Sequence, residues 1–312
     1  MARDGQFTCG TLEALMSRPS GSLSPAKGIA CAIAGGALLT LNDGVMKWLT
    51  GGYPTGEILF VRGAFAFIPI LYLAWRAGGR HALRIRSLGA QSGRATCLIV
   101  SAFLYVTALK YLPLADVVAV TFMVPIIVTA LAPPILGEHV GWRCWAAVIV
   151  GFLGILLLVR PTGEALQIAI MLPLGSATAS AFRDIITRRI SASESSTATV
   201  AFTNGAVMLA GLVTLPLGWI VPSWDDIGLM AIGGIMFGTA HFLYIESLRL
   251  TEAVLVTPFR YFNMVWAILF GFLVWGDFPD VWIFVGTTLI IGSGLYVMSR
   301  EARHRQESGP AR

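Results

Sequence analysis

Charged residues are scarce in this 312-residue sequence: Lys, Arg, Asp and Glu together make up 12% of it, about half the share usual in a soluble protein. Hydrophobic residues make up 56%, and the mean hydropathy is +0.75. A soluble fold of this length cannot hide so much apolar surface, because much of any globule stays in contact with water. The composition therefore excludes soluble, collagen-like and disordered classes and indicates a polytopic membrane protein.

Cysteines and catalytic motifs are also sparse. The four cysteines are scattered, without a CxxC pair, so neither a disulfide framework nor a metal site is expected. The sequence has no GxxxxGK[ST] phosphate loop, no HExxH and no convincing catalytic triad. We expect no cofactor, no metal, no enzymatic activity and no ATP-driven transport by this chain alone. The net charge of +5 is attributed to basic cytoplasmic loops rather than to nucleic-acid binding.

Apolar stretches of the length that spans a bilayer as a helix, about 20 residues, repeat along the chain with short breaks. Residues 1–27 precede them as a polar, flexible tail that lacks the features of a cleaved signal peptide, and 301–312 follow as a second tail. The predicted fold is an all-α membrane bundle of ten transmembrane helices: Gly28–Trp48, Gly56–Trp75, Ala95–Tyr111, Ala115–Leu136, Trp142–Val159, Leu166–Ile186, Ala198–Trp219, Ile227–Leu248, Ala253–Trp275 and Val281–Ser299.

The basic residues predict the orientation of these helices. With both termini in the cytoplasm, 17 of the 22 lysines and arginines fall on the cytoplasmic side and three on the other, while Arg62 and Arg260 fall inside helices. Positive residues accumulate on the cytoplasmic side of membrane proteins. We therefore expect both termini in the cytoplasm and a multi-pass location in a bacterial inner membrane.

The two halves of the chain repeat one another. The matched positions are Phe103–Lys110 with Phe242–Arg249 and Gly137-Glu138 with Gly276-Asp277, at an offset of 139, and Asp43 and Lys47 with Asp184 and Arg188, at an offset of 141. Residues 28–161 and 162–300 thus form two five-helix units. Because five is odd, the second unit crosses the membrane in the opposite sense to the first. Inverted repeats of this kind are common in secondary transporters, whose substrate site lies where the halves meet.

Several segments together resemble the drug/metabolite transporter superfamily, in its EamA-type ten-helix branch. They are Asn42-Asp43 with Lys47-Trp48, Glu57–Arg62, Ala108–Asp116, Pro125, Leu136–His139, Gly151–Leu156, Thr257–Tyr261 and Trp275–Pro279. Within that branch the likeness is greatest to bacterial members assigned to S-adenosylmethionine or riboflavin uptake. One departure is Arg183, which precedes Asp184 where Asn42 precedes Asp43.

The resemblance implies a secondary transporter that moves a small polar organic metabolite, anionic or zwitterionic, by alternating access between two rocking halves. S-adenosylmethionine, riboflavin and amino acids are the candidate substrates. Two other classes stay open: a membrane-embedded enzyme acting on lipid-linked substrates, and a transport-inactive sensor or scaffold. The expected partners are the metabolite and the lipid bilayer, with protons and a second copy of the chain as open alternatives.

Ionisable residues inside a membrane are costly unless they face the bundle interior or a partner. Arg260, about 12 Å inside the ninth helix, is the leading candidate to bind a substrate carboxylate or phosphate; the alternative is an ion pair with Glu246. Arg62 and Glu57 lie five residues apart, about 140° around the axis, so each is expected to contact a different neighbour. Arg62 is alternatively a residue that lines the cavity.

The remaining candidates fall into three groups. Asp43 with Lys47, and Asp184 with Arg188, share a helix face and are predicted to be gating or structural pairs, with direct substrate contact as the alternative. His241 with Glu246 could couple transport to protons, although a lone histidine more often bonds a nearby backbone group. The predicted lining residues of the substrate site are Asn42, Tyr105, Tyr244, Tyr261, Asn263 and His241.

Overall fold

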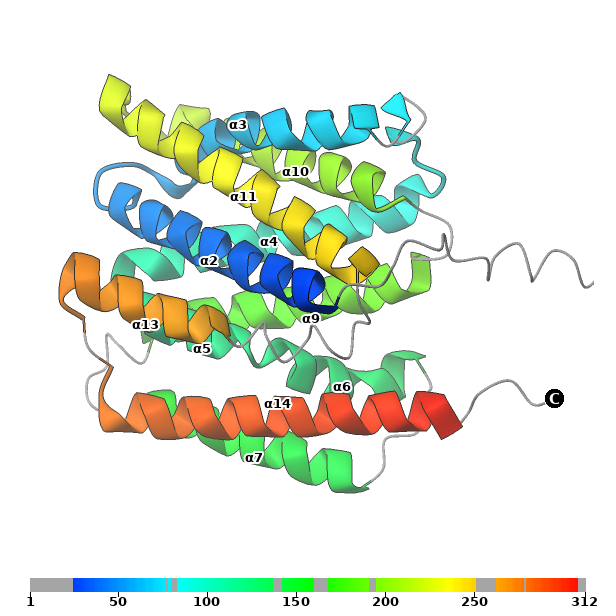
Figure 1. The fold of residues 1–312 in the computed structure, drawn as a ribbon. Coiled ribbons are helices and arrows are strands. Elements are labelled where there is room, and N and C mark those ends of the chain that lie inside the picture. The colour runs from blue at the N-terminus through cyan, green and yellow to red at the C-terminus, as the bar shows by residue number, and fades with distance from the viewer. Residues whose placement is uncertain are drawn as a thin grey trace, which may run out of the picture.

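The computed structural model describes residues 25–76, 78–79, 83–136, 142–159, 168–190, 195–250, 262–277 and 279–307. These residues form an all-helical bundle (Figure 1). Its elements are α2 (Pro25–Leu49), α3 (Thr55–Arg76), α4 (Leu88–Tyr111), α5 (Leu114–Thr121), α6 (Val124–Leu136), α7 (Trp142–Val159), α9 (Met171–Ile190), α10 (Ser196–Val213), the 3-10 turn η2 (Leu215–Leu217), α11 (Trp224–Leu250), α13 (Phe262–Trp275) and α14 (Val281–Glu307).

The helices confirm the membrane fold expected from the apolar stretches. Six of the described helical spans are long and apolar enough to cross a membrane, and two shorter apolar helices, Phe262–Trp275 and Val281–Ser293, accompany them. The fourth predicted span is broken into α5 and α6, because Pro125 has no N–H to continue the helical hydrogen bonds. At the break, the backbone N–H groups of Phe122 and Met123 donate to the carbonyls three residues earlier, those of Ala119 and Val120.

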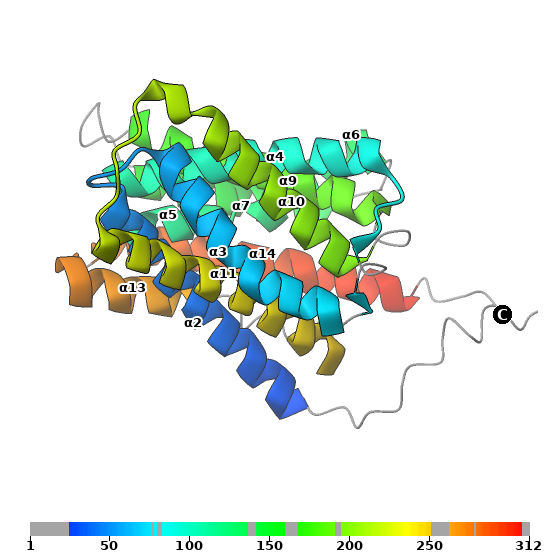
Figure 2. The ribbon, with the colours of Figure 1, turned by 90° about the horizontal axis from the view of Figure 1, so that it is seen from above.

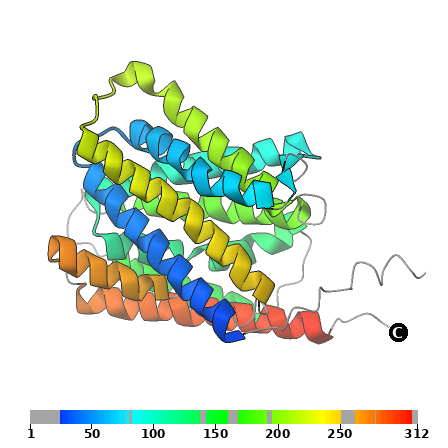
Figure 3. The ribbon, with the colours of Figure 1, turned by 45° about the horizontal axis from the view of Figure 1, so that its top comes forward.

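Helix packing repeats between the two halves. α2 packs against α11 and α13, while its equivalent α9 packs against α4 and α5–α6. α3 contacts α11 as α10 contacts α4, and the equivalent pairs α3–α10 and α7–α14 contact each other. Figures 2 and 3 show α3 beside α10 and α2 beside α11. The Asn204 side chain of α10 donates to the carbonyl of Gly63 in α3 at 3.0 Å. These two residues are equivalent in the repeat, since they are 141 positions apart.

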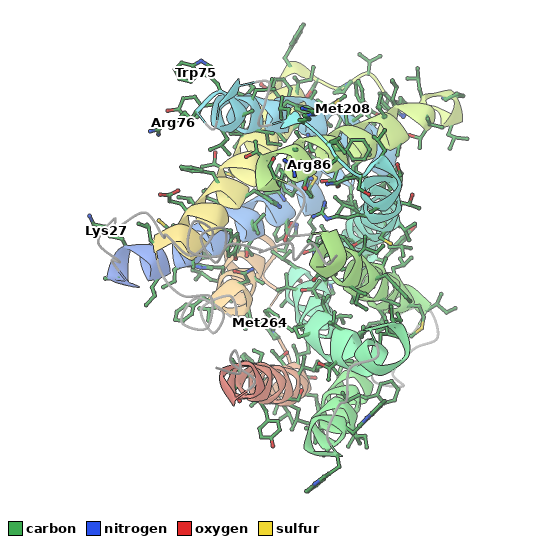
Figure 4. All side chains as sticks on the ribbon, turned by 90° about the vertical axis from the view of Figure 1, so that its right-hand side faces the viewer. Lys27, Trp75, Arg76, Arg86, Met208 and Met264 are labelled. Atoms are coloured by element: carbon green, nitrogen blue, oxygen red, sulfur yellow. The ribbon has the colours of Figure 1, made fainter. Side chains whose placement is uncertain are left out.

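The bundle carries apolar side chains on its outside and polar ones within. Trp75, Val213 and Leu273 are exposed, whereas Asn42, Arg62 and other polar side chains are buried. Figure 4 shows the side chains of Trp75 and Arg76 at the periphery. This distribution suits a lipid environment, in which polar groups are stabilised only by one another. The polar interior is therefore the place to look for a site.

Candidate functional site

A half-buried carboxylate joins α2 to α4. The Tyr105 hydroxyl donates to Asp43 Oδ2 at 2.8 Å, and the Asn42 side chain donates to Asp43 Oδ1 at 3.1 Å. Asn42 is 1% exposed, and its Oδ1 has no hydrogen-bond partner among the described residues. Three residues predicted from the sequence are thus brought together between the first and third helices of the bundle.

Arg62 of α3 belongs to the same cluster as Asp43 and Tyr105. Its side chain is buried, and its charge interacts electrostatically with Asp43 and Tyr105. The guanidinium carbon stacks 4.0 Å from the ring centroid of Phe237 in α11. Within the described part of the chain, Arg62 Nε has no hydrogen-bond partner. A buried charged donor without a partner is costly, so this nitrogen is suited to a ligand oxygen or a water molecule.

His241 extends the cluster along α11. Its ring lies 4.3 Å from that of Phe237, and its Nδ1 lies 3.0 Å from the carbonyl oxygen of Phe237. This is the local backbone bond that we named as the alternative to proton coupling. The charges of Arg62, Arg94 and Arg183 all act on the His241 ring. His241 therefore interacts electrostatically both with Arg62 beside Asp43 and with a second group of charges.

That second group joins α4 to α9. Arg94 Nε donates to the Thr187 hydroxyl at 2.8 Å, and Arg183 donates through Nε and Nη2 to Asp184 Oδ1 at 3.0 and 2.8 Å. Our orientation count placed Arg94 and Arg183 on the cytoplasmic side, and that assignment stays a prediction. Both belong to helices that pack together, where hydroxyl and carboxylate groups hold them in the bundle.

The predicted pair of Asp43 with Lys47 is contradicted by the structure. Lys47 instead lies 3.3 Å from Asp277 Oδ2, donates to the carbonyl of Leu112 at 3.1 Å and stacks 5.1 Å from the Trp275 ring. Asp43 and Lys47 thus each have partners on other helices. Leu112 is the C-cap residue of α4, and the carbonyls at the C-terminus of a helix attract a cation such as Lys47. The side chain of Arg188 lies outside the described residues, so its pairing with Asp184 stays a prediction.

Tyr244 and Asn263 meet at a glycine of α2. A side chain on Gly36 would collide with Asn263 Oδ1 and would lie 3.4 Å from the Tyr244 hydroxyl. Asn263 Oδ1 is buried and has no hydrogen-bond partner among the described residues. These two side chains from α11 and α13 therefore approach α2 closely only because residue 36 has no Cβ.

Other candidates lie apart from the site or cannot be placed. Glu57 accepts a bond from the Ile220 backbone at 3.1 Å, so it anchors the loop before α11 and has a different neighbour from Arg62. Arg260 and Tyr261 lie outside the described residues, and their roles stay predictions. Glu246 is placed on α11, and its role in proton coupling stays a prediction. Among the described residues, no three His, Cys, Asp or Glu side chains are grouped to hold a metal ion.

The arrangement is a strip of charged and polar groups along the contact between the halves. It comprises Asp43, Arg62 and His241 at one end and Arg94 with Arg183-Asp184 at the other, and the electrostatic interaction of His241 with Arg94 and Arg183 links the two ends. The sequence signal that could have revealed the far end is the repeat itself, which places Arg183-Asp184 at the position of Asn42-Asp43. Such a strip offers both signs of charge, hydrogen bonds and aromatic faces to a polar ligand.

Comparison with known proteins assigns the chain to a family. The model of the EamA-like transporter family matches residues 26–160 and again 167–300. The chain is 24% identical over 268 residues to an S-adenosylmethionine uptake transporter of Rickettsia prowazekii, covering 85% of this chain and 90% of that one. It is 25% identical over 298 residues to a riboflavin transporter of Rhizobium johnstonii, covering 94% and 98%.

A transporter with the opposite direction of transport in its name also matches. The pseudopaline exporter of Pseudomonas aeruginosa is 26% identical over 275 residues, covering 85% of this chain and 93% of that one. A solved crystal structure shares 16% sequence identity with a TM-score of 0.63, covering 91% of this chain and all of that one. The structural likeness at this identity shows a common fold alone.

Proposed function

This chain belongs to the EamA-like transporter family, and we propose that it moves a small anionic or zwitterionic organic metabolite by alternating access. It is a multi-pass membrane transporter of the bacterial inner membrane. In our proposal both termini lie in the cytoplasm, and the two inverted five-helix halves rock about the polar strip.

The observation that carries the proposal is the polar strip itself, in which Arg62 is buried and Asp43 and His241 are half-buried. Asp43, Arg62 and His241 come from three different helices and lie along the contact between the halves. Burying ionisable groups in a membrane protein is costly, and such groups usually mark a pathway for substrate or ions. Inverted-repeat transporters bind their substrate where the halves meet. The strip is therefore our candidate for the substrate path.

The chemistry of the strip favours a substrate with both polar and planar parts. Asp43 offers a carboxylate to a cationic group, Arg62 offers a guanidinium to an anionic one, and Phe237 and Tyr105 offer aromatic faces. The relatives are named for S-adenosylmethionine, riboflavin and pseudopaline. We propose S-adenosylmethionine and riboflavin as the first compounds to test, followed by amino acids.

Alternating access also requires that each end of the path can close. The Lys47–Asp277 contact joins the end of α2 to the loop after α13, and Leu112 adds the end of α4 to the same contact. We propose that this three-way contact closes the path at the end of the bundle where α2 ends. Lys47 remains a gating residue in this account, with Asp277 as its partner in place of Asp43.

The test is a thermal-shift screen of the whole purified protein with S-adenosylmethionine, riboflavin, amino acids, nucleotides and sugar phosphates. A ligand at 100 times its Kd adds about 2.7 kcal/mol to the stability of the folded state. We expect one of these compounds to raise the melting temperature of the wild type. Arg62→Gln should lose this increase, and Arg76→Gln should keep it. Arg76 is an exposed residue of α3, so its substitution removes the same charge outside the strip.

Two results would count against the proposal. If none of the compounds shifts the wild type, the proposed substrate class is wrong. If a compound shifts the wild type and Arg62→Gln equally, it binds without Arg62, and the strip around Asp43 is not its site. Arg62→Lys distinguishes charge from geometry, because lysine keeps the charge but lacks the planar fork of N–H donors.

A further inference from the structure

We propose that Arg94 and Arg183 form an oxyanion-binding subsite of the strip, which takes the carboxylate or phosphate group of the transported metabolite. The subsite lies between α4 and α9, at the end of the strip away from Asp43. This inference rests on the proposed transport function, and it names the group of the substrate that these two residues bind.

The first argument comes from comparing equivalent positions in the two halves. Asn42 donates to Oδ1 of Asp43, and Arg183 donates to Oδ1 of Asp184, so the same contact between neighbours is made in both halves. An uncharged asparagine is therefore sufficient to hold this aspartate. The positive charge of Arg183 is additional to what that contact needs, which points to a role beyond helix structure.

The second argument comes from Arg94. At the offset of 139 that relates α4 to α11, its equivalent is Gly233, so this cation too is present in one half only. Arg94 uses Nε to bind Thr187, but its buried Nη1 has no hydrogen-bond partner among the described residues. Thr187 in turn donates to the carbonyl of Arg183. The threonine thus fixes the Arg94 side chain beside α9 with an N–H donor still to be satisfied.

The third argument is the charge balance. The like charges of Arg94 and Arg183 act on one another, and Asp184 is the carboxylate that acts on Arg94. Among the described residues, two guanidinium groups stand against one carboxylate at this place, where unpaired charge is costly. A ligand oxyanion would neutralise the excess and accept the remaining N–H groups, which is the geometry guanidinium groups favour. The Arg183 side chain is 26% exposed, so the helices do not fully enclose it.

The experiment compares ligands that differ only in an oxyanion. Binding to the whole detergent-purified protein is measured for S-adenosylmethionine against decarboxylated S-adenosylmethionine, and for riboflavin 5′-phosphate against riboflavin. The first pair tests a carboxylate and the second a phosphate. The variants are Arg94→Gln and Arg183→Asn. The second variant recreates the Asn-Asp sequence that the first half already accommodates, so it is expected to fold.

We expect the wild type to bind the oxyanion-bearing member of at least one pair about tenfold or more tightly, as expected for a charge-assisted hydrogen bond. Arg94→Gln and Arg183→Asn should each reduce that preference to near unity while the oxyanion-free member binds as before. Arg76→Gln should keep the preference. Melting temperature without ligand and elution from a sizing column check that each variant is folded.

Separate outcomes overturn the subsite and the transport function. Equal binding of both members by the wild type, or a preference that survives in both variants, overturns the subsite and leaves the proposed function standing. Failure of all four ligands to bind the folded wild type overturns the proposed substrate class and the subsite with it. A preference lost only with Arg62→Gln would move the oxyanion to the Asp43 end and would also overturn this assignment.

Discussion

Replacing Lys47 by methionine tests whether the contact at the end of α2 acts as a gate. Methionine keeps most of the side-chain length and packing but removes the ammonium group. That group lies 3.3 Å from Asp277, donates to Leu112 at 3.1 Å and stacks on the Trp275 ring. Asp116 of α5, a second carboxylate, also interacts electrostatically with Lys47. The substitution therefore removes several attractions between α2 and its neighbours at once.

The size of the effect follows from these contacts. A hydrogen bond from a charged donor contributes about 1.5 kcal/mol, whereas a partly exposed ion pair contributes about 0.5 kcal/mol. The Lys47 side chain is 12% exposed and that of Asp277 is 41% exposed, so the smaller value suits the ion pair. If these contacts exist only in the closed state, their loss shifts the closed–open equilibrium by about 2 kcal/mol, or about thirtyfold.

Distance measurements between two spin labels can detect this shift. Gly52 has open space around it, and Val281 is exposed at the start of α14, so cysteines at both positions can carry labels in a background without the native cysteines. We expect Lys47→Met to increase the population with the longer distance. The matched control is Lys110→Met, since Lys110 is exposed and lies near the same end of the bundle. Identical distance distributions in the wild type and Lys47→Met would refute the gate.

Three further predictions follow from the packing and topology. Tyr105→Phe should lower the stability of the folded protein by about 1–3 kcal/mol, because Asp43 loses a 2.8 Å bond in a buried setting; an unchanged midpoint of chemical unfolding would contradict this. Gly154→Leu should separate α7 from α14, since even a Cβ would lie 2.8 Å from a backbone oxygen of α14; a wild-type melting temperature would show that the contact tolerates bulk. Cysteines replacing Arg84 and Val221 should react with impermeant reagents from the cytoplasmic and the opposite side respectively, and labelling of both from one side would contradict the orientation.

Much of the fold could be predicted from the sequence because a bilayer imposes simple rules. A membrane span needs a long apolar stretch, and the odd number of spans in each repeat requires inversion. The break between α5 and α6 was missed because Thr121–Pro125 stays apolar in hydropathy even though Pro125 cannot continue the hydrogen bonds.

The site could be predicted only in part. Ionisable residues such as Asp43 and Arg62 stand out in an apolar stretch, so the sequence identifies them as candidates. Their partners are harder to predict, since Lys47 contacts a residue 230 positions away rather than the aspartate one turn back. Arg94 and Arg183 lie near the ends of apolar stretches, so the sequence does not indicate which side chains they contact. The bond from Arg94 to Thr187 follows only from the packing of α4 on α9.

The most direct test of transport through the strip is counterflow in proteoliposomes. Vesicles containing the protein are loaded with an unlabelled compound, and uptake of the same labelled compound is followed, first with S-adenosylmethionine and then with riboflavin. We expect the wild type to accumulate at least one of them and Arg62→Gln, inserted to the same level, to take up at least tenfold less. Uptake by Arg62→Gln at the wild-type rate would contradict transport through the strip, because the substrate would then cross the membrane without Arg62.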